Sequence, residues 1–155
     1  MSAPIWFKAL PTELFTTMHT GLVGHIGIEL TEAGPDFLKG RMPVDQRTRQ
    51  PFGLLHGGAS IVLAETLASV ASSASVDLRV KRCVGLEINA NHLRGVKSGW
   101  VTGIARPIHL GRATHVWDIQ ITDEGDRLVC ISRCTVAVVD APVGEAGSAT
   151  QGERS

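Results

Sequence analysis

The sequence predicts an α+β domain in which one long central helix is wrapped by a curved antiparallel β-sheet. Residues 57–76 are apolar on nearly every side, which is typical of a helix that is covered all round. Two segments with strand-like alternation precede this helix and four follow it. Short turns join consecutive segments, as they do in antiparallel sheets. Because one sheet covers only part of a helix, the pattern also indicates that a second subunit covers the rest.

A short helix and a hairpin are expected before the long helix. Residues 12–20 follow Pro11, have an apolar face and end at Gly21, so they are predicted to form a helix. Residues 26–30 and 38–44 alternate between apolar and other side chains on either side of a turn-forming cluster. This arrangement predicts two paired strands.

The other elements are also predicted from local pattern. Residues 45–55 are polar and then rich in glycine and proline, so we expect a loop. Residues 1–140 are interpreted as one domain, and residues 141–155, which lack an apolar pattern, as a disordered tail. After the long helix, strands are predicted at residues 84–90, 100–108, 113–121 and 128–139.

Composition and motifs exclude several classes of function. Fifteen Lys and Arg residues balance fifteen Asp and Glu residues, whereas nucleic-acid and anionic-membrane binders usually carry a basic excess. No apolar run approaches the ~20 residues of a membrane span, and the apolar stretch near the N-terminus is too short for a signal peptide. We therefore expect a cytoplasmic protein. There is no Walker A, GxSxG or HExxH motif. The cysteines form no CxxC pair, so we expect no metal site and interpret Cys130 and Cys134 as packing residues.

Glu65 is out of place in the apolar helix. A carboxylate buried without a partner is costly, and no basic residue between positions 57 and 77 can pair with it. Because perturbed carboxylates are concentrated at active sites, Glu65 is the candidate catalytic residue. The alternative is that Glu65 points to solvent or pairs with a distant arginine. Ser69, one turn later, is either a hydrogen-bonding partner of Glu65 or a small packing residue.

The start of the long helix is a second candidate feature. His56 and Gly57 precede free backbone N–H groups at the positive end of the helix dipole, which suit a carbonyl oxygen that becomes an oxyanion. Alternatively, they form only a turn with a structural histidine. His56 and Glu65 are nine residues apart, which is ~13.5 Å along a helix. If they share a site, Glu65 should therefore come from a second subunit across a two-fold interface.

Several stretches resemble one known family. They are the sequence MPVD at residues 42–45, QPFGLLHGGAS at 50–60, LAE at 63–65, VGLEINANH at 84–92 and PIHLGR at 107–112. These stretches resemble the hotdog-fold acyl-CoA thioesterases of the 4-hydroxybenzoyl-CoA thioesterase type, which have a catalytic glutamate. The likeness covers about residues 10–140. It extends to the bacterial 1,4-dihydroxy-2-naphthoyl-CoA thioesterases and the proofreading thioesterases of enterobactin synthesis.

The resemblance implies a hotdog fold and a homodimer with shared active sites, usually paired into a homotetramer. It implies that Glu65 is the nucleophile or the general base that activates water. The Gly57 N–H would polarise the thioester carbonyl. Gln50 and His56 would position the thioester or the water, and Ser69 would support Glu65.

The resemblance also implies an aryl- or acyl-CoA substrate, 1,4-dihydroxy-2-naphthoyl-CoA among them, that is hydrolysed without a cofactor. One carboxylate and one oxyanion donor can suffice, because a thioester is already activated. Two alternatives remain open: hydrolysis of acyl groups on a carrier protein, and a non-catalytic acyl-CoA-binding domain, which would have no need of Glu65. The implied path of CoA runs along Gly85, His92, Leu93, Arg94, Gly95, His109, Leu110, Gly111, Arg112, Ala113 and Thr114.

Overall fold

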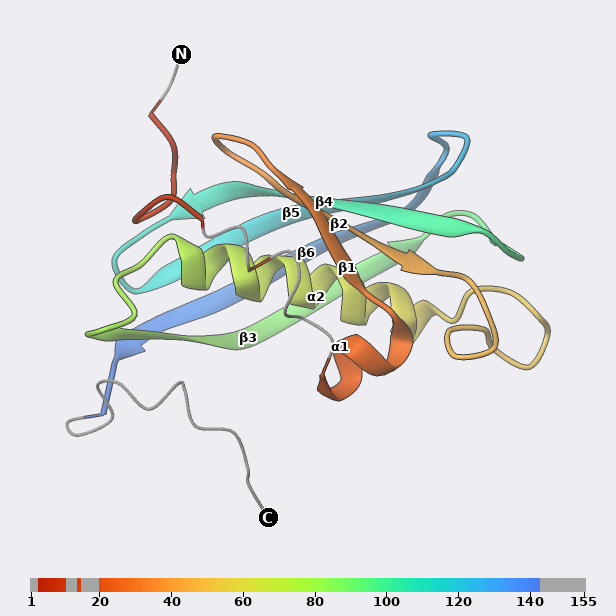
Figure 1. Ribbon diagram of the computed structural model, residues 1–155, viewed down its shortest axis with the longest axis horizontal. Coiled ribbons are helices and arrows are strands. Elements are labelled where there is room, and N and C mark those ends of the chain that lie inside the picture. Colours follow the sequence, from red (N-terminus) through yellow and green to blue (C-terminus); the bar gives the residue numbers. More distant parts are fainter. Residues whose placement is uncertain (1–2, 11–13, 15–19, 143–155) are drawn as a thin grey trace.

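One long helix lies across a six-stranded antiparallel sheet (Figure 1). The computed structural model describes residues 3–10, 14 and 20–142. The predicted α+β class, with its long helix and curved sheet, is confirmed. In chain order the elements are α1 (Gly21–Ile26), β1 (Glu29–Ala33), β2 (Leu38–Pro43), α2 (Gly57–Ala74), β3 (Lys81–His92), β4 (Trp100–Leu110), β5 (Thr114–Asp123) and β6 (Leu128–Asp140).

The order of strands in the sheet differs from their order in the chain. It is β1-β2-β4-β5-β6-β3, and every neighbouring pair is antiparallel. After β2 the chain therefore passes through α2 to the opposite edge of the sheet, where β3 pairs with β6. This crossover places α2 along one face of the sheet and leaves β3 as an edge strand (Figure 1).

The core lies between α2 and the sheet. The inner face of the helix is fully buried, and two sheet glycines let it approach closely. A Cβ added to Gly40 or to Gly103 would lie 2.9 Å or 2.8 Å from a methyl carbon of Leu67. Trp117 fills the same core and donates from Nε1 to Ser72 Oγ at 2.7 Å. Cys130 and Cys134 are both buried, as expected of packing residues.

The outer face of α2 is not covered within one chain. Val62, Thr66 and Val70 are only half-buried there, so the helix is apolar all round but enclosed on one side only. Along the neighbouring edge strand, Val84 and Leu86 are 51% and 61% exposed. None of the described helices is long and apolar enough to cross a membrane.

Two local predictions near the N-terminus are corrected. The helix expected at residues 12–20 falls almost wholly outside the described residues. The structure has α1 at Gly21–Ile26, so Gly21 does not end a helix and Ile26 does not begin a strand. The helix α1 ends at Ile26 and is followed by the C-cap Gly27, whose φ of 76° lies in the left-handed region. Ile26 is buried against the core, which the alternating pattern alone could not distinguish from a strand position.

Candidate active site

The loop before α2 is held by backbone hydrogen bonds that orient its polar side chains. Gln50 N–H donates to the Leu54 carbonyl at 2.8 Å, and Gly53 N–H donates back to the Gln50 carbonyl at 2.9 Å. The side-chain carbonyl of Gln50 accepts the N–H of Phe52. Its amide NH₂ is therefore the group that remains for a ligand. The predicted loop is confirmed, with one isolated bridge between Arg49 and Leu55.

His56 is the N-cap of α2. Its Nδ1 accepts the N–H of Gly58 at 2.8 Å, so the proton of the neutral ring is on Nε2. The His56 side chain is exposed, which leaves this Nε2–H available as a donor. The Gly57 N–H has no hydrogen-bond partner among the described residues. Two donors at the start of the helix are therefore free to meet a ligand.

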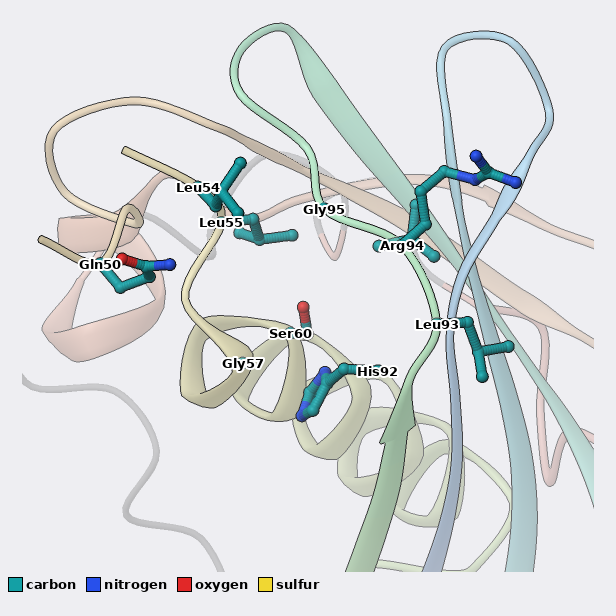
Figure 2. Close-up of a pocket in the computed structure, with 10 residues that line it drawn as sticks. Gln50, Leu54, Leu55, Gly57, Ser60, His92, Leu93, Arg94 and Gly95 are labelled. Atoms are coloured by element: carbon teal, nitrogen blue, oxygen red, sulfur yellow. The ribbon is translucent and has the colours of Figure 1, made fainter. Parts of the chain in front are cut away.

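A pocket of about 360 Å³ opens beside this helix start (Figure 2). The His92 ring lies against the first turn of α2, where a Cβ added to Gly57 would be 2.8 Å from His92 Nε2. In Figure 2 the side chains of Leu93 and Arg94 point away from the pocket. The lining residues are Gln50, Leu54, Leu55, Gly57, Ser60, His92, Leu93, Arg94, Gly95 and Val129.

Glu65 lies in a second pocket, of about 370 Å³, between α1 and α2. The expectation that this carboxylate is buried is wrong for the single chain, because Glu65 is on the uncovered face of α2 and is exposed. It makes no ion pair within the described part of the chain. Ser69 lines the same pocket, as its position one turn later predicts. The lining residues are Leu22, Val23, Val62, Glu65, Thr66, Ser69 and Val70.

Glu65 also lies against the edge strand β3. A Cβ added to Gly85 would be 2.9 Å from Glu65 Oε1, so only glycine leaves room for the carboxylate in this position. Gly85 was expected on the CoA path. The structure places it beside the candidate catalytic carboxylate instead of beside the first pocket.

Cys134 in β6 is a thiol close enough to Glu65 to be affected by its charge, and it is considered as a competing nucleophile. Burial raises the pKa of the Cys134 thiol to about 11, and the negative charges of Glu65 and Glu87 add to this effect. The thiol is therefore protonated at neutral pH and a poor nucleophile.

The two segments expected along CoA lie at opposite ends of the sheet (Figure 1). His92 to Gly95 lie at and just beyond the end of β3 next to the first pocket, whereas residues 109–114 span the end of β4, the turn and the first residue of β5. Within that turn the His109 ring covers Gly111, where an added Cβ would clash with it. The segment that holds Leu110, Arg112, Ala113 and Thr114 therefore does not join the first pocket within one chain.

Sequence reasoning missed the apolar walls of both pockets. Leu54, Leu55 and Val129 line the first pocket, and Leu22 and Val23 form one wall of the second. The pattern offered no signal for Leu22 and Val23, because they follow the glycine that was predicted to end a helix. Leu54 and Leu55 lie in the segment predicted to be a loop, whereas Val62, Val70 and Val129 lie in segments whose pattern already indicates core packing.

The candidate residues thus form two separate half-sites in one chain. Gln50 and Gly57 line the first pocket with hydrogen-bond donors, and His56 caps the helix beside them without lining the pocket. Glu65 and Ser69 supply a carboxylate and a hydroxyl on the outer face of α2. The separation agrees with the spacing argument that one chain cannot easily bring His56 and Glu65 to the same atom.

Several known proteins are similar to this chain in sequence and fold. Residues 52–130 match the family model of the thioesterase superfamily. The Escherichia coli (strain K12) protein named 1,4-dihydroxy-2-naphthoyl-CoA hydrolase is 48% identical over 136 residues, which cover 87% of this chain and 99% of that protein. The proofreading thioesterase EntH of Cronobacter turicensis is 49% identical over 137 residues, which cover 87% and 98%. The crystal structure of a glutamine-to-alanine variant of thioesterase PA1618 from Pseudomonas aeruginosa has a TM-score of 0.86 at 48% identity, covering 88% of this chain and 99% of that one.

Proposed function

Because the chain belongs to the thioesterase superfamily and is a thioester hydrolase, we propose that it cleaves aryl- or acyl-CoA thioesters into the free acid and CoA. The resemblance stated from the sequence is confirmed at the level of the family. The observation that carries the finer proposal is the pair of half-sites on α2. A free N–H at Gly57 begins the helix, and the Glu65 carboxylate lies in a pocket on its outer face.

The Gly57 N–H is proposed to polarise the thioester carbonyl. It lies at the positive end of a helix of 18 residues, and it lines the first pocket. Negative charge that develops on the carbonyl oxygen is stabilised by such a donor and by the helix dipole. The NH₂ of Gln50 and the Nε2–H of His56 are the neighbouring donors proposed to orient the thioester or the water.

Glu65 is proposed to attack the thioester carbon or to take a proton from the attacking water. In the first case a mixed anhydride forms, the C–S bond breaks, the thiolate of CoA leaves, and water then hydrolyses the anhydride. In the second case the hydroxide equivalent adds directly and the same C–S bond breaks. The Ser69 hydroxyl lines the pocket of Glu65 and is proposed to hydrogen-bond the carboxylate or the water.

A dimer is proposed to join the first pocket of one protomer to Glu65 of the partner subunit. The uncovered face of α2 and the edge strand β3 support this arrangement, because both flank Glu65 and both present apolar side chains such as Val62, Val84 and Leu86. A two-fold axis would then create two identical sites per dimer. We further propose that two dimers form a tetramer.

The acyl group is proposed to enter the pocket between α1 and α2. Its walls carry apolar side chains from both helices, and Glu65 lies at its lining. An aromatic acyl group suits such walls, and the name of the Escherichia coli relative points to a naphthoyl thioester. Hydrolysis of acyl groups on a carrier protein is the second candidate, because relatives named proofreading thioesterases are similarly close to this chain.

A thiol-release assay tests the proposal. The assay compares wild type with Glu65→Gln and with the control Glu124→Gln, which changes an exposed glutamate in the β5–β6 turn. The substrates are aromatic and straight-chain acyl-CoAs and an acylated carrier protein. We expect wild type and the control to hydrolyse acyl-CoA, and Glu65→Gln to lose a factor of about 100 or more in kcat. Unchanged oligomeric state would show that the loss is chemical. Turnover by Glu65→Gln at the wild-type rate would refute the role of Glu65, and hydrolysis of the carrier-protein thioester alone would favour the second candidate.

A further inference from the structure

We propose that Arg47 is a positioning residue that holds α1 against α2 and thereby sets which acyl groups the pocket beside Glu65 accepts. The inference rests on the proposed function for its acyl part. Its structural part, the anchoring of α1, stands on contacts in the single chain.

The Arg47 guanidinium caps the C-terminal end of α1. Its Nη1 donates to the carbonyl of His25, in the last turn of the helix, at 3.3 Å. The guanidinium also approaches Gly27, where an added Cβ would be 3.1 Å from both Nη1 and Nη2. A cation at this end of a helix bonds an otherwise unpaired carbonyl and complements the helix dipole.

Arg47 is itself held by Asp45. Its Nη2 is 2.6 Å from Asp45 Oδ2, and its backbone N–H donates to Asp45 Oδ1 at 2.9 Å. The same turn continues into Thr48, whose hydroxyl donates to the carbonyl of Pro43 at 2.7 Å and which is buried. The guanidinium is therefore presented to α1 from a rigid base.

Among the described residues, the helix that Arg47 caps has few other anchors. It spans six residues, and the N-cap residue Thr20 makes no side-chain cap. Ile26 is buried, whereas Leu22 is 58% exposed. Short helices are only marginally stable without tertiary contacts. The loss of one anchor should therefore destabilise the whole of α1.

The wall of the pocket beside Glu65 depends on this helix. Leu22 and Val23 face Val62 and Val70 of α2 across the pocket. If α1 moves outward, the pocket widens and its apolar contacts with an acyl group weaken. Arg47 does not line the pocket, so its effect on the substrate has to pass through α1.

The turn that holds Arg47 also supports the other half-site. The carbonyl of Thr48 accepts the N–H of His56 at 2.8 Å, which fixes the start of α2 beside the first pocket. Arg47 makes no contribution to that bond. Its replacement should therefore alter recognition of the acyl group and spare recognition of CoA.

The chain contains a matched control pair. Asp77 and Arg79 have the same spacing and the same bidentate geometry, with Arg79 Nη2 2.7 Å from Asp77 Oδ2. The side-chain hydrogen bonds of Arg79 go to Asp77, and none reaches α1 within the described residues. Arg79→Ala thus removes an equivalent ion pair without removing an anchor of α1.

The test compares Arg47→Ala, Arg47→Lys, Arg79→Ala and Val23→Ala with wild type. Steady-state kinetics on benzoyl-CoA and on a naphthoyl-CoA give kcat and KM, and inhibition by free CoA reports recognition of CoA. Hydrogen exchange at the amides of Gly24, Gly27 and Ile28 reports the anchoring of α1 without any turnover.

We expect Arg47→Ala to raise KM about fivefold to tenfold for at least one thioester, with kcat within about twofold and inhibition by CoA unchanged. Exchange in α1 should increase about tenfold while exchange in α2 does not change. Arg47→Lys should recover part of both effects, Val23→Ala should reproduce the kinetic effect alone, and Arg79→Ala should show neither.

Unchanged exchange in α1 of Arg47→Ala would overturn the anchoring. Equal losses on every substrate and on CoA, accompanied by a lower Tm, would overturn the positioning role in favour of general destabilisation. A wild type that hydrolyses no acyl-CoA would instead refute the proposed function and with it the acyl preference, while the exchange data would still decide the anchoring.

Discussion

The carboxylate of Glu65 in α2 occupies the space that a side chain at Gly85 in β3 would take. A Cβ added to Gly85 would lie 2.9 Å from Glu65 Oε1. At this contact, α2 contributes the carboxylate of Glu65 and β3 contributes only the backbone of Gly85. This contact limits where the candidate catalytic group can point.

Gly85→Ala is expected to displace the Glu65 carboxylate and to reduce activity. The clash is with the end of a flexible side chain, so the backbone can stay in place and the stability should change little. We expect kcat/KM for an acyl-CoA to fall about tenfold or more, because small misplacements of a catalytic group are costly. Gly125→Ala, where an added Cβ meets only ordinary contacts at 3.4 Å, is the control. Normal activity of Gly85→Ala would argue against this position for the carboxylate during catalysis.

Gly57→Ala should separate helix stability from activity. Alanine favours a helix over glycine by about 1 kcal/mol, but its Cβ would lie 2.8 Å from His92 Nε2. We therefore expect a Tm at or above that of wild type and a lower kcat/KM, because the His92 ring, which lines the pocket, must shift. Gly58→Ala tests the adjacent position, where the added Cβ would lie 3.0 Å from His56 Nδ1. A gain in activity for Gly57→Ala would contradict this arrangement.

His56 has a capping role and a free donor, which two variants distinguish. Asparagine also caps helices well, so His56→Asn should retain stability while it loses the Nε2–H. His56→Ala should lose the cap as well, at about 1 kcal/mol of unfolding free energy. Activity should fall in both variants, and denaturant unfolding should show a loss in the alanine variant only. If His56→Asn keeps full activity, the Nε2–H has no part in the reaction.

The buried hydrogen bond between Trp117 and Ser72 should contribute to stability. Ser72→Ala would leave the indole N–H of Trp117 without its 2.7 Å partner in the core, which costs about 1–3 kcal/mol. Because Trp117→Phe removes the same donor, the double variant should lose less than the sum of the two single losses. Ser98→Ala, at an exposed position, is the control in urea unfolding. Strict additivity would show that the bond contributes nothing.

Acid should destabilise the fold through His115. This side chain is 3% exposed, and burial, with a smaller effect of His109, lowers its pKa below the ordinary 6.5. The unfolded chain then binds a proton at a higher pH than the folded chain, so the unfolding free energy falls as the pH drops from about 6.5 through the folded pKa. His115→Leu should make this slope shallower, and His25→Gln, at an exposed histidine, should not. Identical slopes in wild type and His115→Leu would exclude His115 as the cause.

Local pattern was sufficient for most of the elements because strands and helices differ in period. The alternation before and after α2 indicated six strands, although β1 runs from Glu29 to Ala33 instead of over residues 26–30, and β3 extends back to Lys81. Pattern failed at Gly21 and Ile26. Either Gly21 or Gly27 can end a helix by its local chemistry, and in the structure Gly21 begins α1 whereas Gly27 caps it, next to the buried Ile26.

The residues of the candidate site were identified from the sequence by their type, but their arrangement in space could not be predicted from it. Glu65 stood out as a charge in an apolar helix, but its exposure depends on which face the sheet covers. The contact between Glu65 and Gly85 joins residues of different elements, and it follows from the crossover that brings β3 to the edge next to α2. The role of Leu22 and Val23 as a pocket wall depends on the position of α1 against α2.

By itself the sequence determined the α+β class, the family and the set of polar residues around α2, because periodicity and motif spacing are properties of neighbouring residues. Only the tertiary structure decided that these residues form two pockets, that Glu65 lies on the uncovered face, and that Arg47 closes α1. Those relationships join segments far apart in the chain. They are set by strand order and by the packing of one helix face, which no local pattern encodes.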